Sequence, residues 1–185
     1  KWIAEVKFMK AYYHFWLFKS YGPIPIVDQN LPIYVSTEEV KIYRDPVDSV
    51  VNYIVKLIDE AIPDLPLMLL SEATDMGRIT KPIATAIKAR VLATAASPLF
   101  NGNPDFTSLT DNRGVKLFPA AYDAGKWQKA ADAAKIAIET AELANFSLVN
   151  EYTTKYTHSP AMLRELMLRS IVTTKGNSEV IWGCT

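Results

Sequence analysis

The chain has 185 residues, of which 49% are hydrophobic and 22% charged, and its 20 acidic and 20 basic side chains balance at neutral pH. This length is sufficient for one domain, which would bury about 70% of the surface that the unfolded chain exposes. The balanced charge, without a basic block, argues against a nucleic-acid partner bound through its phosphates. Cys184 is the only cysteine, which excludes an internal disulfide and a zinc site built on paired cysteines.

Residues 1–21 are predicted to form a helix with two apolar stripes on nearly opposite sides. Gly22 and Pro23 should end this helix, and its apolar stretch is too short to span a membrane. Two stripes favour a helix that is packed between neighbours on both sides. The first stripe contains Trp2, Val6, Met9, Tyr13 and Trp16, and the second contains Ala4, Phe8, Ala11, Phe15 and Phe18.

Three further helices are expected along the chain. A Pro-rich connection leads to a helix over about 46–63, which Asp45 is suited to cap. An alanine-rich helix over 82–97 is stopped by Pro98 and should be well buried. After an irregular loop, a helix over 125–144 places on one face Trp127, Ala130, Ala131, Ala134, Ile138 and Ala141.

The C-terminal part has a weaker pattern, which indicates a helix at about 161–169 and a short extended segment at 179–182. The fold class predicted from these elements is all-α, built from helix pairs with long irregular connections. Trp2, Trp16 and Trp127 lie on the predicted apolar stripes, so we expect them in the core. Replacing Trp16 by alanine should then destabilise the fold by about 3–5 kcal/mol.

No catalytic, metal or cofactor site is expected. His14 lies on the first helix and His158 in a loop, and neither belongs to a known catalytic spacing. The acidic loop that begins at Asp105 lacks the spacing of an EF-hand and its final Glu. An α-helical hydrolase is therefore the weakest alternative.

Ligand contacts have only a few candidates. Glycans bind by stacking a sugar ring on Trp or Tyr while amides and carboxylates bond to the hydroxyls. The candidates outside the predicted helices are Asn101, Asn103, Asp105 and Trp182. The loop residues among them could equally serve as turn formers.

Several sequence blocks, taken in order, resemble the SusD/RagB family of bacterial outer-membrane nutrient-binding lipoproteins. The match runs over nearly the whole chain. Lys10 stands where the family commonly has Arg, and 152–178 matches poorly. The matching blocks are 4–5, 10–13, 21–25, 43–47, 59–61, 65–66, 77–81, 96–103, 127–131 and 179–182.

The resemblance implies a right-handed superhelix of tetratricopeptide-like helix pairs. It implies that residues 1–185 are a single partial domain, an internal fragment of the N-terminal half of a longer protein. The signal peptide and the lipid-bearing cysteine would then lie outside this chain. Cys184 does not match the lipobox cysteine, because it stands at the wrong end of the chain.

In function, the resemblance implies a cell-surface lipoprotein of the outer membrane that captures an oligosaccharide or another nutrient without cleaving it. Its partner would be a SusC-like TonB-dependent transporter, and it would touch the membrane only through a lipid anchor. The alternative is a helical-repeat scaffold for protein–protein interaction without a small ligand. In the family, the ligand platform draws mainly on loops before the first helix and on the irregular half that this chain lacks.

Overall fold

A computed structural model describes residues 1–69, 71–174 and 176–183, and Cys184 therefore lies outside the described part. Within these ranges regular structure is helical apart from an isolated bridge between Thr110 and Lys116, which confirms the all-α prediction. The helices are α1 (Trp2–Tyr21), α2 (Val47–Ala61), α3 (Glu72–Asp75), α4 (Lys81–Ala96), α5 (Gly125–Leu143) and α6 (Pro160–Thr173), with short 3-10 turns η1 (Ile62–Asp64) and η2 (Pro104–Phe106).

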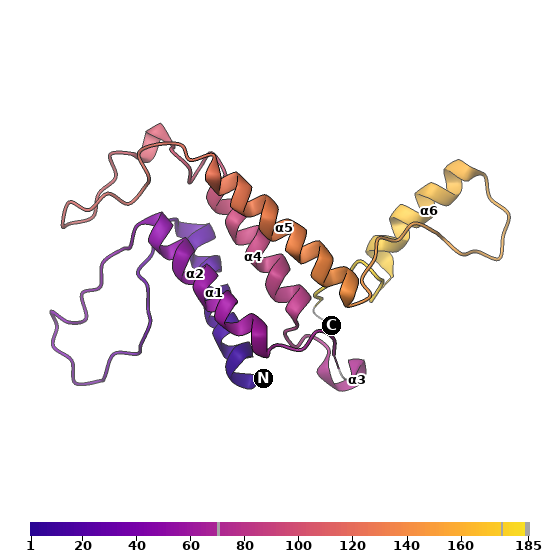
Figure 1. Cartoon of the computed structure of the whole chain (residues 1–185), viewed down its shortest axis with the longest axis horizontal. Helices are drawn as coiled ribbons and strands as arrows, with labels where there is room; N and C mark the ends of the chain where they lie inside the picture. Colours follow the sequence, from indigo (N-terminus) through magenta and orange to yellow (C-terminus); the bar gives the residue numbers. More distant parts are fainter. Residues whose placement is uncertain (70, 175, 184–185) are drawn as a thin grey trace.

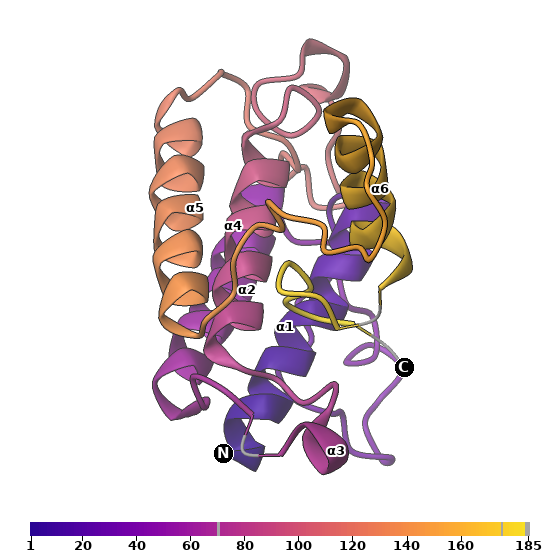
Figure 2. The same ribbon diagram turned by 90° about the vertical axis from the view of Figure 1, so that its right-hand side faces the viewer.

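Four long helices form the body of the molecule. α1, α2, α4 and α5 run alternately up and down, so each is antiparallel to the next (Figures 1 and 2). The most extensive contacts join α4 with α5 and α1 with α2, and α2 also packs on α4. The long connections 22–46 and 97–124 both leave from the end of the body where α1 and α4 finish (Figure 1). The body therefore consists of two helical hairpins laid side by side.

The core is built on the second apolar stripe of α1. Phe8, Phe15 and Phe18 are buried against α2, whose own buried side chains recur at helical spacing. At the end of α1, Gly22 takes φ +71° and its N–H donates to the Phe18 carbonyl, as a glycine C-cap does. The ring of Phe100 lies 4.5 Å from that of Phe18, so the 97–124 connection is anchored to the core.

The first stripe of α1 corrects the sequence prediction. Trp2 is 75% exposed and Trp16 is 51% exposed, so neither is a core residue in this structure. Val6 and Tyr13 are exposed as well. α1 is therefore covered on one side only, and the predicted loss of 3–5 kcal/mol on truncating Trp16 does not apply to the chain in this conformation.

The predicted face of α5 is only partly buried. Trp127 is 45% exposed, and Ala131, Ala134 and Ile138 are exposed. The buried side chains are Ala130 and Ala141, as predicted, together with Ala133, and they lie on the α4 side. Alanine lets helices approach closely on either face, so an alanine-rich sequence does not determine which face is buried.

Two smaller expectations fail for local reasons. Asp45 does not cap α2, because its carboxylate accepts a hydrogen bond from the Ile26 N–H at 2.8 Å and so fastens the connection 22–46. Residues 179–182 form turns and bends rather than an extended strand.

Candidate functional site

Asn101 is a buried structural residue. It is 3% exposed, its Nδ2 donates to the Asp123 carbonyl at 2.9 Å, and its Oδ1 accepts from the Asp123 N–H at 2.9 Å. Its amide is thus used in joining the start of the 97–124 connection to its end. This arrangement leaves little of Asn101 for a ligand.

Asn103 and Asp105 lie nearer the solvent. The Asn103 Oδ1 accepts from the Asp105 N–H at 3.0 Å and caps the 3-10 turn η2, while Asp105 itself is exposed. Both residues therefore form a turn, as one of the two sequence interpretations expected. Among the described residues, the Asp105 carboxylate has no hydrogen-bond partner.

Trp182 lies elsewhere in the molecule. Its ring packs edge-on against Tyr12 of α1, with centroids 5.2 Å apart, and against Phe8 at 6.1 Å. Its Nε1–H donates to the Gly77 carbonyl at 3.3 Å. Gly77 follows α3, at the end of the body opposite the 97–124 connection (Figures 1 and 2). The four sequence candidates do not form one site.

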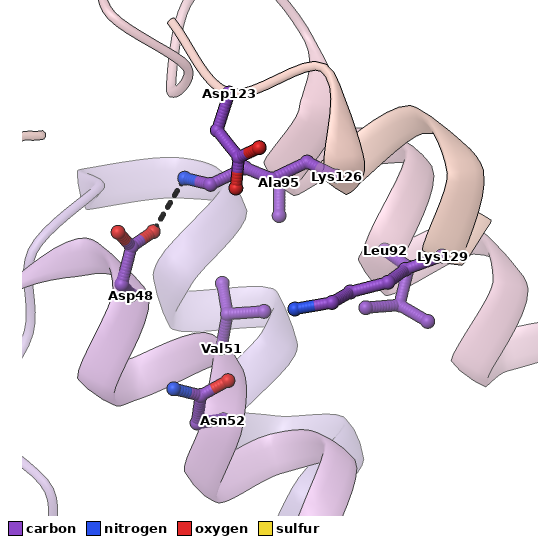
Figure 3. Close-up of a pocket in the computed structure, with 8 residues that line it drawn as sticks. All are labelled: Asp48, Val51, Asn52, Leu92, Ala95, Asp123, Lys126 and Lys129. Carbon is purple, nitrogen blue, oxygen red and sulfur yellow. Dashed lines mark hydrogen bonds and ion pairs between the residues drawn. The ribbon is translucent and has the colours of Figure 1, made fainter. Parts of the chain in front are cut away.

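A polar pocket lies between the first turns of α2 and α5 and the last turns of α4 (Figure 3). Its volume is about 150 Å³. Val51, Leu92 and Ala95 supply apolar walls, and the polar side chains around them are Asp48, Asn52, Asp123, Lys126 and Lys129. Asn101 contributes indirectly, because it holds the backbone of Asp123, whose carboxylate in turn accepts from the Gly125 N–H at the start of α5.

The charged side chains of this pocket are two acids and two bases, and two of them form an ion pair with each other. Lys126 donates to the Asp48 carboxylate at 2.5 Å, and its side chain is largely covered. With two carboxylates, two ammonium groups and one amide, the pocket suits a small neutral polar group rather than an ion. Its polar groups can donate to and accept from hydroxyls, but no nucleophile and base are paired in it.

A second pocket, of about 220 Å³, lies between α2, α4 and α5 further along the body. Lys88 donates to Asp59 at 2.6 Å on its rim. Ile62, Ala133 and Ile136 make much of its wall apolar. Its polar lining residues are Asp59, Lys81, Thr85, Lys88 and Thr140. Several of these polar groups are already used within the fold, since Lys88 pairs with Asp59 and the Thr85 hydroxyl donates to backbone carbonyls of α4.

A charged network fastens the connection 22–46 to the helices. Asp28 accepts from Lys10 at 3.1 Å and from the Tyr53 hydroxyl at 2.9 Å. These two hydrogen bonds, with the Lys10 charge, hold the pKa of Asp28 below its usual range. The nearby Tyr53 hydroxyl and the Asp28 carboxylate outweigh burial and raise the pKa of Lys10. Lys10 therefore has a structural partner in Asp28.

The histidines have structural or surface places. His14 is buried, and its Nδ1 lies 2.8 Å from the Lys10 carbonyl, so Nδ1 carries the proton. Its Nε2 then accepts from the Val27 N–H at 3.4 Å.

The described residues hold no cluster of three or more His, Cys, Asp or Glu side chains suited to a metal. Among the described helices, none has both the length and the apolar character to cross a bilayer.

The pocket residues were missed by sequence analysis for a clear reason. Asp48 and Asp123 each lie at a helix start, where an acidic residue is explained by the helix dipole or by capping. Lys126 and Asp48 are 78 positions apart, so only the packing of α5 beside α2 brings them together. The sequence signal that leads nearest to the pocket was Asn101, which positions Asp123.

Solved structures resemble this chain, some of them over its entire length. BT4246 matches with a TM-score of 0.86 and 31% identity, covering 100% of this chain and 34% of its own. A SusD-like protein from Bacteroides fragilis NCTC 9343 matches with a TM-score of 0.63 and 21% identity, over 97% of this chain and 26% of its own. A laminarin-binding SusD-like protein matches with a TM-score of only 0.42 and 24% identity, over 62% of this chain and 25% of its own.

The chain corresponds to only part of these longer proteins. The chain spans about a third of the length of BT4246. No protein-family model and no curated protein matches the chain.

Proposed function

We propose that this SusD-like chain forms part of the helical scaffold of a longer protein that binds a nutrient, such as an oligosaccharide, for uptake. The observation that supports this most is the match of the entire chain to BT4246 at a TM-score of 0.86, together with the fold shared with the Bacteroides fragilis protein. The chain spans about a third of the BT4246 length, so the activity belongs to the longer protein.

We propose that the longer protein is a surface lipoprotein of the outer membrane and that it passes its ligand to a SusC-like TonB-dependent transporter. Recognition would rest on shape and ring stacking, with no bond broken. Within this chain, Asn103 and Asp105 are the proposed ligand contacts with free surface, because Asn101 and Trp182 already have partners inside the fold.

The scaffold role is the second candidate, and the pockets favour it for this part of the protein. Both are small, and the polar one is partly closed by the ion pair between Lys126 and Asp48. We expect most ligand-contacting residues to lie outside this chain.

Calorimetry on the longer protein with a panel of polysaccharides tests nutrient capture. We expect saturable heat with at least one glycan and no shortening of that glycan on incubation. Absence of heat with every glycan, combined with stable co-purification of another protein, would support the scaffold role instead. Shorter products would overturn the proposal that no bond is broken.

A further inference from the structure

The polar pocket between α2, α4 and α5 contains side chains that the fold does not use. Asp48 and Lys126 pair with each other at its edge. Within the described part of the chain, neither the Asn52 amide nor the Lys129 ammonium makes a hydrogen bond or an ion pair, and both side chains are exposed to solvent. Figure 3 shows the Lys129 ammonium extending from α5 toward α2, on the side where Asn52 lies. Two polar groups from different helices therefore converge on one hollow.

Part of the wall of this pocket is aliphatic. Val51 of α2 lines it together with Leu92 and Ala95 of α4. Such a wall favours contact with C–H groups, whereas the Asn52 amide can both donate and accept and the Lys129 ammonium can donate. A ligand with only C–H surface, or only polar surface, would leave part of the pocket unmatched. The pocket therefore fits a molecule that has aliphatic ring carbons on one side and hydroxyls around its edge.

Charge and size restrict the ligand of this pocket further. Its two acids and two bases leave no net charge, so an ionic ligand would meet a like charge for every opposite one. Its volume of about 150 Å³ is smaller than the about 300–1,000 Å³ of pockets that enclose drug-sized ligands. A single ring with its hydroxyls is therefore the unit that matches the pocket, rather than a chain of several rings.

We infer that this pocket is a subsite for a single neutral sugar ring, formed by residues other than Asn103 and Asp105. The hydroxyls of the ring bond to Asn52 and Lys129, and its C–H face packs on Leu92. The inference rests on the proposed function for the source of the sugar, which is a unit of the captured nutrient. It requires no bond to be broken and no contact with a transporter.

Methyl NMR of the complete polypeptide, with isotopically labelled Ala, Leu and Val methyl groups, tests the subsite. Glucose, galactose, mannose and xylose are titrated separately. We expect the signals of Val51, Leu92 and Ala95 to shift in a saturable way with at least one of these sugars, with a Kd of about 1–10 mM, as few contacts allow. Val172 of α6, which is 87% exposed, is the control within the same molecule and should show no saturable shift.

Substitutions and charged sugars test the assigned contacts. Asn52→Ala and Lys129→Ala remove groups without a partner in the described part of the fold, so each should leave Tm nearly unchanged while raising the Kd at least about fivefold. Lys135→Ala is the matched control, because Lys135 lies on α5 outside the pocket with its side chain 79% exposed, and it should keep the Kd within about twofold. Glucuronate and glucosamine should bind at least about fivefold more weakly than the neutral sugar.

Three results would overturn the subsite. They are pocket signals that do not move with any neutral sugar up to about 100 mM, shifts that survive both Asn52→Ala and Lys129→Ala unaltered, and shifts with glucuronate or glucosamine alone. Calorimetry with polysaccharides separates this failure from failure of the proposed function. Heat with a polysaccharide but no pocket shifts would remove the subsite and leave nutrient capture standing. Pocket shifts with a neutral sugar but no heat with any polysaccharide would support the subsite and remove nutrient capture.

Discussion

Asn101 has more importance for the fold than its place in a loop suggests. Its buried amide satisfies both backbone groups of Asp123, so removing it leaves a donor and an acceptor without partners. We predict that Asn101→Ala lowers the free energy of unfolding by about 2 kcal/mol. Asn103→Ala is the matched control, because it loses one hydrogen bond near solvent and should cost less than about 1 kcal/mol. Urea denaturation measures both, and equal losses would contradict the structural role of Asn101.

Gly102 is required by both its backbone conformation and its surroundings. Its φ is +72°, and a Cβ at this position would lie 2.4 Å from the Tyr122 backbone nitrogen. Gly114 has a similar φ of +79° but nothing within 4 Å of a Cβ. Gly114→Ala should therefore cost about 1 kcal/mol, the left-handed strain alone. Gly102→Ala should cost clearly more, because backbone must shift, and thermal unfolding that ranks the two equally would refute this.

Asp28 makes the attachment of the connection 22–46 sensitive to acid. Its pKa is below the ordinary carboxyl range in the folded state, so its ionised form contributes stability at neutral pH. That contribution is lost as the pH falls below about 4 and through the lowered pKa. We predict that the Tm difference between the wild type and Asp28→Asn shrinks as the pH falls from about 7 to about 3. A difference that stays constant over this range would show that the ionised carboxylate is not the source.

The interface between α4 and α5 depends on small side chains. Ala130 is buried on the α4 side, whereas its neighbour Ala131 is exposed, although the sequence pattern placed both on one face. Ala130→Leu should therefore lower the free energy of unfolding by about 1–3 kcal/mol through overpacking. Ala131→Leu adds the same side chain one position further and should stay within about 0.5 kcal/mol of the wild type. Denaturant titrations compare them, and the reverse order would mean that α5 presents to α4 a face turned by about 100° toward Ala131.

Helix positions were predictable along the chain because local chemistry sets them. Gly22 and Pro23 end α1, and Pro98 follows α4 closely, as their backbone restrictions require. The buried side of α2 was also predictable, since its apolar residues form one stripe. α3 was missed because a four-residue helix offers no periodic pattern.

The assembly of the helices could not be predicted to the same extent. Whether a stripe is buried depends on what lies beside it, which the two stripes of α1 and the alanines of α5 do not specify. The pocket around Asp48 and Lys126 could not be predicted from the sequence either, because its walls come from three helices separated by long connections. Only the order in which the helices pack creates it.

Stability should be uneven over the whole molecule. α6 has no fully buried side chain and makes no extensive contact with another described helix, and Figure 1 shows it apart from the four-helix body. α4 lies between α2 and α5 and is buried along much of its length. Amides of α6 should therefore exchange through local opening, whereas those of α4 should require opening of the body.

Hydrogen exchange followed by mass spectrometry tests this difference peptide by peptide. We expect peptides from α6 to exchange at least about tenfold faster than peptides from α4, with α2 close to α4. A mild denaturant should then reduce the protection of α4 and α2 together, because they belong to one packed unit, while leaving the exchange of α6 almost unchanged. If α6 instead matches α4 at every denaturant concentration, α6 is part of the same cooperative unit, and its contacts with the body are stronger than its exposed side chains indicate.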